Sequence, residues 1–326
     1  MLSIAQAREL TAVVVPVYFQ PTVNRETITL ILESTFADHE LFCLPEKLLV
    51  VVDEGTKAKA VLREARSGSP LYDLPLYVLD KNRGKAGAIQ AGLDEILKRT
   101  QAPYVVTRDC DGDHAIEDIP RMISMAEDIR SDTGSTLISI FGVRPSLEKP
   151  MGWFRQEWEG FINRILEDWS DFLAAKTDTV VDKRYWNGYE LDAQSGYRVY
   201  SRQAARLSAD LLAQLPGDPD VFVFACELVP FIELILRGGL IGQVQRMTLI
   251  EQPVSSFEGV DLSRSYGMLL RYLCKNYRAP TDSLLRIFDN HLLTTSLYFS
   301  EFREKLMECR RYIKSDEAIT LAPRFS

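Results

Sequence analysis

Short apolar runs recur through the first half of the chain and alternate with longer polar or amphipathic segments. The runs are rich in valine and other β-branched residues, which is typical of parallel strands buried on both faces. Helical periodicity between the runs is clearest at residues 26–36 and 85–98, where apolar side chains fall on one side. Strand, helix and strand at this spacing imply right-handed crossovers, so an α/β fold with a mostly parallel sheet is predicted. The expected strands are residues 11–18, 48–52, 76–79, 104–106 and 137–141.

The second half of the chain has a different pattern, in which helical segments dominate. No internal repeat, low-complexity tract or linker interrupts it, so we expect one compact unit whose second half completes and covers the site. The expected elements are helices at residues 152–169, 222–237, 263–277 and 283–313, a loop at 176–190 and a strand at 240–249.

The charge balance excludes one large class of function. The 326 residues carry 38 Lys and Arg against 46 Asp and Glu, a net charge of −8, whereas a general nucleic-acid-binding protein shows a basic footprint. Five cysteines are scattered without a CxxC pair, so neither a zinc site nor a disulfide framework is expected, and a reducing cytosol is the simplest compartment. No apolar segment approaches the roughly 20 residues of a membrane span, so any membrane contact is expected to be peripheral. A homo-oligomer is compatible with this composition.

An acidic run directly follows the fourth expected strand. Asp109, Asp111 and Asp113 alternate within it, and a buried strand would deliver them to the crevice beyond its carboxyl end, where open α/β sheets bind ligands. Carboxylate oxygens suit hard cations such as Mg²⁺ or Mn²⁺, and these cations in turn bind phosphates. The run therefore indicates a metal-assisted site for a nucleotide diphosphate compound, and a solvated acidic loop is the structural alternative.

The ends of the other expected strands carry side chains that suit the same ligand. Pro16 and Tyr18 end the first strand, and Tyr18 could stack on a base or pack in the core. Asp53 ends the second, where it could bind a base or ribose or cap the next helix. After the third, Lys85 opens a helix within the small-residue segment 82–88, and helix N-termini favour anions. This segment is neither a P-loop nor a GxGxxG motif, which argues against ATPases and dehydrogenases.

Taken in this order, the motifs resemble the GT-A glycosyltransferases of family 2. The likeness extends over residues 11–250 and is greatest to the polyprenyl-phosphate sugar transferases of the dolichol-phosphate mannose synthase type. Residues 189–200 are similar to the D-x-x-S-G-F-R segment of that family. The other segments that carry the resemblance are residues 16–18, the strand into Asp53, residues 82–88 and Asp109–Asp111.

The resemblance implies a division of the chain and a donor site. A GT-A-like domain would cover residues 1–250, with a nucleotide-sugar-binding half at 1–142 and an acceptor half at 143–250. Residues 251–326 would form a helical extension. The residues implied around the donor nucleotide are Pro16, Tyr18, Asp53, Lys85 and Asp109.

The resemblance also implies the metal, phosphate and catalytic groups. Asp111 and Asp113 would ligate Mg²⁺ or Mn²⁺, and Arg144 and Arg198 would face phosphates. Asp192 would act as a general base, or would orient the acceptor. Members of this family transfer the sugar in a single displacement that inverts the sugar carbon.

The expected function is therefore metal-dependent transfer from a UDP- or GDP-sugar to a sugar, lipid-phosphate or small-metabolite acceptor. It would take place in the cytoplasm, with a peripheral contact at the inner face of a membrane as one arrangement. Family members often have Asn-Glu-Glu where this chain has residues 19–21, which leaves the nucleobase contacts open. A sugar-phosphate nucleotidyltransferase is the second enzymatic hypothesis, although its glycine-rich loop is replaced here by the bulky residues 18–21. A nucleotide-sugar-binding protein without activity is the non-enzymatic alternative.

Overall fold

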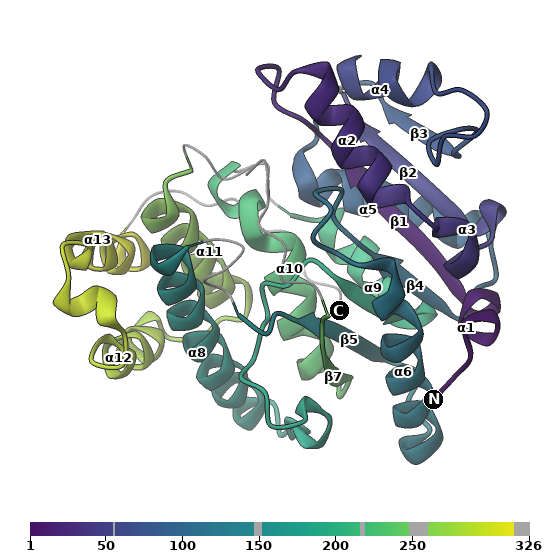
Figure 1. The fold of residues 1–326 in the computed structure, drawn as a ribbon. Coiled ribbons are helices and arrows are strands. Elements are labelled where there is room, and N and C mark those ends of the chain that lie inside the picture. The colour runs from purple at the N-terminus through teal and green to yellow at the C-terminus, as the bar shows by residue number, and fades with distance from the viewer. Residues whose placement is uncertain (55, 147–151, 216–218, 248–259, 316–326) are drawn as a thin grey trace.

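The fold is built around one mixed sheet, in which the described residues form seven strands in the order β3-β2-β1-β4-β6-β5-β7. A computed structural model describes residues 1–54, 56–146, 152–215, 219–247 and 260–315 (Figure 1). The expected α/β fold and the strands predicted in the first half are confirmed, with ends within two residues of the expected positions. The strands are β1 (Thr11–Val17), β2 (Leu48–Asp53), β3 (Leu76–Leu79), β4 (Tyr104–Thr107), β5 (Ile138–Val143), β6 (Arg198–Ser201) and β7 (Leu240–Gln245).

One strand of this sheet runs against the others. β6 pairs antiparallel with both β4 and β5, whereas all the other pairs are parallel. The carboxyl ends of β1, β2, β3 and β4 therefore meet at one edge of the sheet, and the amino end of β6 reaches the same edge. This arrangement brings the segment before β6 to the loops that follow the parallel strands.

Helices cover both faces of the sheet, because successive side chains of a strand point to opposite faces. Val14 and Val51 belong to one buried cluster with residues of α5, α8, α9 and α10, whereas Val13, Val15 and Val50 belong to a second cluster with residues of α1, α2, α4 and α6. The helices α8, α11, α12 and α13 lie together on the side of the molecule away from β3 (Figure 1). The helices that flank the first strands are α1 (Ile4–Leu10), α2 (Arg25–Phe36), α3 (His39–Phe42), α4 (Thr56–Arg63), α5 (Gly84–Arg99) and α6 (Ile119–Thr133). The later helices are α8 (Trp153–Lys176), α9 (Arg202–Leu212), α10 (Pro219–Leu236), α11 (Leu262–Asn276), α12 (Thr281–Leu292) and α13 (Arg303–Lys314).

Close packing of α5 on the sheet depends on a glycine. A Cβ atom at Gly92 would lie 2.4 Å from Cγ1 of Val14 and 2.8 Å from Cγ2 of Val51. We expect Gly92→Ala to lower the free energy of unfolding by about 1–3 kcal/mol, because overpacking forces the buried core to shift. Urea denaturation measures this loss. The matched control is Gly160→Ala in α8, where the added Cβ would meet only Nη1 of Arg164, at 3.5 Å. Equal stabilities of the two variants would contradict the packing.

The prediction of one continuous helix at residues 283–313 is wrong. The chain forms α12 and α13, separated by a short 3-10 helix at Ser296–Phe299. The Thr295 hydroxyl accepts from the backbone of Leu297, and the Glu157 carboxylate of α8 accepts from both the hydroxyl and the backbone amide of Ser296. These polar contacts satisfy backbone groups that a continuous helix would have used, and so end the first helix.

Three smaller differences concern element ends. α8 continues to Lys176, beyond the expected end at residue 169, and the loop expected at 176–190 contains a short 3-10 helix, Arg184–Trp186. The strand expected at 240–249 ends at Gln245 in the structure, and the last two residues of that prediction lie outside the described residues. No described helix combines the length and the apolar character needed to cross a membrane.

Candidate functional site

Asp53 connects the end of β2 to the start of α5. Its carboxylate accepts a hydrogen bond from the backbone amide of Arg83 at 2.7 Å and is 1% exposed. Burial raises the pKa of Asp53, although the amides of Arg83 and Gly84 partly oppose this. The carboxylate therefore fixes the loop that leads into α5, and its expected contact with a nucleoside stays a prediction.

Lys85, at the start of α5, lies between two carboxylates. Its Nζ atom is 2.9 Å from Asp109 after β4 and 2.9 Å from Glu227 in α10. Burial alone would lower the pKa of Lys85, but the two carboxylates outweigh it and raise the pKa well above the ordinary value. The structure thus brings Lys85 and Asp109 together and adds Glu227 as a shared partner.

The segment before β6 packs directly against this pair through a glycine. A Cβ atom at Gly196 would lie 2.7 Å from Oδ2 of Asp109 and 2.9 Å from Nζ of Lys85. Both are ends of side chains that can move, so we expect Gly196→Ala to fold normally but to separate the pair. Loss of one charge-assisted contact should weaken binding of a nucleoside diphosphate by about tenfold. Calorimetry on Gly196→Ala and the Gly160→Ala control measures this, and equal affinities would argue against a nucleotide site here.

The three aspartates after β4 do not point the same way. Gly112 has φ +79° and turns the chain between Asp111 and Asp113. Oδ1 of Asp111 accepts from the Asp113 amide at 3.1 Å, and its side chain is only partly buried. Burial, together with the neighbouring carboxylates of Asp109 and Asp113, raises the pKa of Asp111 to about 6. Asp111 thus lies among other negative charges, and a bound cation would reduce the repulsion between these carboxylates.

Asp113 has a different partner from the expected metal ion. It is 2% exposed, and its Oδ2 atom lies 2.8 Å from Nη2 of Arg246, directly after β7. The Arg246 side chain is also buried, so the pair joins the acidic loop to the end of the edge strand β7. Arg246 thus competes with a metal ion for this carboxylate, and the ligand role expected of Asp113 stays a prediction.

The remaining donor set fits a cation that is shared with a substrate. Among the described residues, no group of three or more His, Cys, Asp or Glu side chains is arranged to hold a metal ion. Mg²⁺ is usually bound by one or two carboxylates together with substrate phosphates, rather than by a cage of protein ligands. Asp111, with Asp109 next to it, can provide such a partial set.

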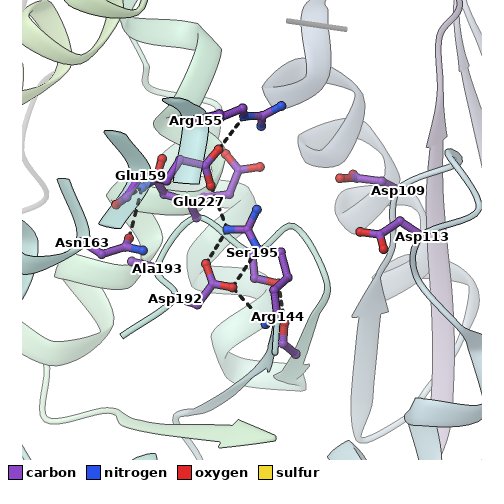
Figure 2. Close-up of polar contacts among 12 residues, drawn as sticks. Asp109, Asp113, Arg144, Arg155, Glu159, Asn163, Asp192, Ala193, Ser195 and Glu227 are labelled. Carbon is purple, nitrogen blue, oxygen red and sulfur yellow. Dashed lines mark hydrogen bonds and ion pairs between the residues drawn. The ribbon is translucent and has the colours of Figure 1, made fainter. Parts of the chain in front are cut away.

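Arg144 organises the other side of the site. It donates to both carboxylate oxygens of Asp192, from Nε at 2.8 Å and Nη2 at 2.5 Å, and to Glu159 at 2.8 Å. Arg155 donates to the second oxygen of Glu159 at 2.7 Å. Figure 2 shows this network on one side of the site and Asp109 and Asp113 on the other. Burial alone would raise the pKa of Asp192, but Arg144 outweighs it and holds the pKa below the ordinary value.

The lowered pKa of Asp192 has a consequence for stability at low pH. A carboxylate with a depressed folded-state pKa stabilises the protein above its unfolded pKa of about 4, and this contribution is lost as pH falls through the folded value. We expect Asp192→Asn to be less stable than wild type at pH 7, with a difference that narrows below about pH 4. Denaturant unfolding between pH 7 and 3 tests this, and a constant difference would show that Asp192 is not ion-paired.

Arg198 is buried among backbone carbonyls, and its expected contact with a phosphate stays a prediction. It is 1% exposed and donates to the backbone carbonyls of Ser195 at 2.9 Å, Glu227 at 2.7 Å and Ala193. Its guanidinium also lies 4.1 Å from the ring centre of Phe141. Arg198 therefore holds the segment before β6 against α10.

His114 supports the acidic loop through the backbone of that loop. Its Nδ1 atom accepts from the Asp109 backbone amide at 2.8 Å, and its ring stacks on Tyr197 at 4.7 Å. Burial, together with the nearby charge of Arg246, lowers the pKa of His114 well below the ordinary value. The histidine is therefore held as the neutral imidazole, and its Nδ1 atom positions the backbone of Asp109.

Comparison with known proteins decides the family. The sequence model of glycosyl transferase family 2 matches residues 12–206, which is more than half of the chain. The chain belongs to glycosyl transferase family 2. It is thus a glycosyltransferase, and the fold is the α/β arrangement expected for the GT-A type.

Similar proteins carry names that concern lipid phosphates. Proteins named undecaprenyl-phosphate 4-deoxy-4-formamido-L-arabinose transferase are 28% identical over 117 residues in Yersinia enterocolitica (36% of this chain, 33% of that protein) and 26% identical over 156 residues in Serratia proteamaculans (48% and 43%). The chain thus spans less than half the length of these relatives. The solved structure of S. aureus TarS 1-349 is similar at a TM-score of 0.42 and 12% identity, over 93% of this chain and 71% of that one.

The site of this family 2 glycosyltransferase contains residues that sequence reasoning missed. Glu159 comes from α8 and Arg246 from the end of β7, and their charged partners lie 15 and 133 residues away along the chain. No local pattern marks either residue, because each acquires its role only through the distant partner. Pro16 and Tyr18 stand at the end of β1 as expected, with Tyr18 38% exposed, and their nucleoside contacts stay predictions.

A surface hollow of about 600 Å³ lies elsewhere in this glycosyltransferase. Its lining includes Tyr104 at the start of β4, Ile138 at the start of β5, and Ser201 at the end of the antiparallel β6. These positions mark the opposite edge of the sheet from Asp53 and Asp109. The hollow is therefore separate from the candidate active site.

Proposed function

We propose that this glycosyltransferase moves a sugar, with inversion, from a nucleotide-diphosphate donor to an acceptor that carries a phosphate. The observation that carries the proposal is the pairing of Asp192 with Arg144 through both carboxylate oxygens. A carboxylate that is paired in this way is a poor proton acceptor. The pairing therefore favours a phosphate acceptor, which is already ionised, over a hydroxyl acceptor, which must first lose a proton. The names of the lipid-phosphate relatives point in the same direction.

The donor would bind at the carboxyl edge of β1 to β4. Asp53 fixes the loop against which the nucleoside would lie, and Asp109 and Lys85 would contact the ribose and diphosphate. A divalent cation held by Asp111 together with phosphate oxygens would supply positive charge to the departing nucleoside diphosphate. Lys85 would add a second, permanently charged group on the same side.

The acceptor side is best suited to an anionic nucleophile. A general base works best when its pKa lies near the operating pH. Burial acting alone would raise the pKa of Asp192, yet the adjacent Arg144 holds it below the ordinary value, so Asp192 is a weak base. A phosphate oxygen is already ionised and needs orientation, which the Arg144 network can provide. A lipid phosphate would be reached by peripheral contact at the inner face of a membrane.

A panel assay tests the proposal. UDP- and GDP-sugars are offered with Mg²⁺ or Mn²⁺, together with either a short-chain polyprenyl phosphate in detergent or the matching alcohol. We expect metal-dependent transfer to the phosphate and none to the alcohol, with products read by mass spectrometry. Transfer to the alcohol alone would overturn the acceptor class. Release of pyrophosphate from a nucleoside triphosphate and a sugar phosphate would favour a nucleotidyltransferase, and nucleotide binding without turnover would favour a binding protein.

A further inference from the structure

A helix outside the family match reaches the segment that carries Asp192. Tyr266 of α11 donates its hydroxyl hydrogen to Oε1 of Gln194, two residues after Asp192. The family match ends at residue 206, so Tyr266 belongs to a part of the chain that the family pattern does not cover. The contact joins the C-terminal extension to the acceptor side of the site.

Tyr266 is held rigidly in its position. It is 1% exposed, and its ring stacks on Phe224 of α10 at 4.0 Å and 7°. The neighbouring Gly267 faces α13, where an added Cβ would lie 2.5 Å from Cβ of Tyr312 and 2.7 Å from the backbone carbonyl oxygen of Cys309. This close approach fixes the rotation of α11 about its axis. Burial raises the pKa of Tyr266 well above the ordinary value, so its hydroxyl stays protonated and can donate.

Gln194 connects Tyr266 to α8, which carries the Glu159 partner of Arg144. Its Nε2 atom donates to the backbone carbonyl of Glu159 at 2.9 Å and to Oδ1 of Asn163 at 3.1 Å, both in α8. The same Glu159 carries the carboxylate that accepts from Arg144. One amide side chain thus connects α8, α11 and the segment that contains Asp192.

We propose that Tyr266 is a positioning residue for the acceptor side: through Gln194, it fixes the segment that presents Asp192 to Arg144. The catalytic consequence rests on the proposed function, whereas the structural consequence does not. The donor groups Asp53 and Asp111 stand on other strand ends, and only Gly196 of this segment approaches Asp109, so the effect should fall mainly on the acceptor. The C-terminal extension then positions the acceptor site, in addition to packing against the rest of the fold.

The test is Tyr266→Phe, which keeps the stacked ring and removes only the hydroxyl. The matched control is Tyr277→Phe at the end of the same helix, where the hydroxyl donates to Glu233 at 2.9 Å. Amide hydrogen exchange is measured over residues 190–197, binding of UDP and GDP by calorimetry, and transfer to a short-chain polyprenyl phosphate at varied acceptor concentration.

We expect Tyr266→Phe to speed exchange over residues 190–197 by up to about tenfold, the effect of one lost buried hydrogen bond. Nucleotide affinity should change less than acceptor KM, and acceptor KM should rise more than kcat falls. Tyr277→Phe should change none of these. Gln194→Met should have at least as large an effect, since it also removes the contacts to Glu159 and Asn163. The double variant should be no worse than Gln194→Met alone, because Tyr266 acts through Gln194.

Unchanged exchange over residues 190–197 in Tyr266→Phe would overturn the proposal, as would equal losses of donor and acceptor binding. Additive effects in the double variant would also overturn it. Absence of transfer by the wild-type protein would instead count against the proposed function, and the exchange result would still decide whether Tyr266 fixes the segment.

Discussion

Replacing Asp111 with asparagine is expected to abolish metal-dependent transfer while leaving the protein folded. The substitution keeps the shape of the side chain and removes the charge that would hold a cation against the diphosphate. Loss of one group that stabilises a developing negative charge lowers turnover by about 100- to 1,000-fold. The melting temperature should not fall, because the variant relieves the crowding of Asp111 by Asp109 and Asp113.

Asp128→Asn is the control for this prediction, since Asp128 is a solvent-exposed aspartate on α6. It should keep wild-type turnover and metal dependence. Turnover is measured over a range of Mn²⁺ concentrations for both variants. If Asp111→Asn retained wild-type turnover, or showed the wild-type dependence on Mn²⁺, Asp111 would not be the metal ligand.

Replacing Arg144 with methionine is expected to cause the largest loss of stability. The side chains of Arg144, Asp192 and Glu159 are 8%, 5% and 3% exposed, so removing the cation leaves buried carboxylates with an uncompensated charge. Breaking a buried pair in this way lowers the free energy of unfolding by about 3–5 kcal/mol. Transfer should be lost as well, since Arg144 provides the charge on the acceptor side.

Two further variants separate stability from activity. Arg130→Met removes an exposed ion pair with Glu127, with side chains 52% and 23% exposed, and should lower stability by less than about 1 kcal/mol. The double variant Arg144→Met with Asp192→Leu replaces the buried pair by apolar groups and should recover part of the stability. We expect it to remain inactive. Recovery of transfer in the double variant would exclude the ion pair from the acceptor site.

The sheet, and the meeting of Lys85 with Asp109 at its edge, were predictable from the sequence. Parallel strands place their carboxyl ends at one edge, so Asp53, Lys85 and Asp109 could be expected at the same edge once the strands were recognised. Each of them stands within a few residues of a strand end. Local pattern is sufficient in such cases, because the topology of the sheet brings the side chains together.

The acceptor side could not be derived in this way. Arg198 stands in a motif that suggested phosphate binding, but its guanidinium lies inside the fold, against the ring of Phe141 and the backbone carbonyl of Glu227 in α10. The partner of Asp113 is Arg246, which lies 133 residues later in the chain. Whether a charged side chain faces a ligand or an internal partner depends on such distant contacts. The hydrophobic periodicity of the sequence does not predict these contacts.

The most direct test of the site is a crystal structure with UDP or GDP and Mn²⁺, in which anomalous scattering locates the metal. The expected result is a manganese ion bonded to a carboxylate oxygen of Asp111 and to the diphosphate, with the nucleoside beside Asp53. A nucleotide bound at the opposite edge of the sheet, in the hollow near Tyr104 and Ile138, would contradict the assignment. So would a metal ion bonded elsewhere than to Asp111.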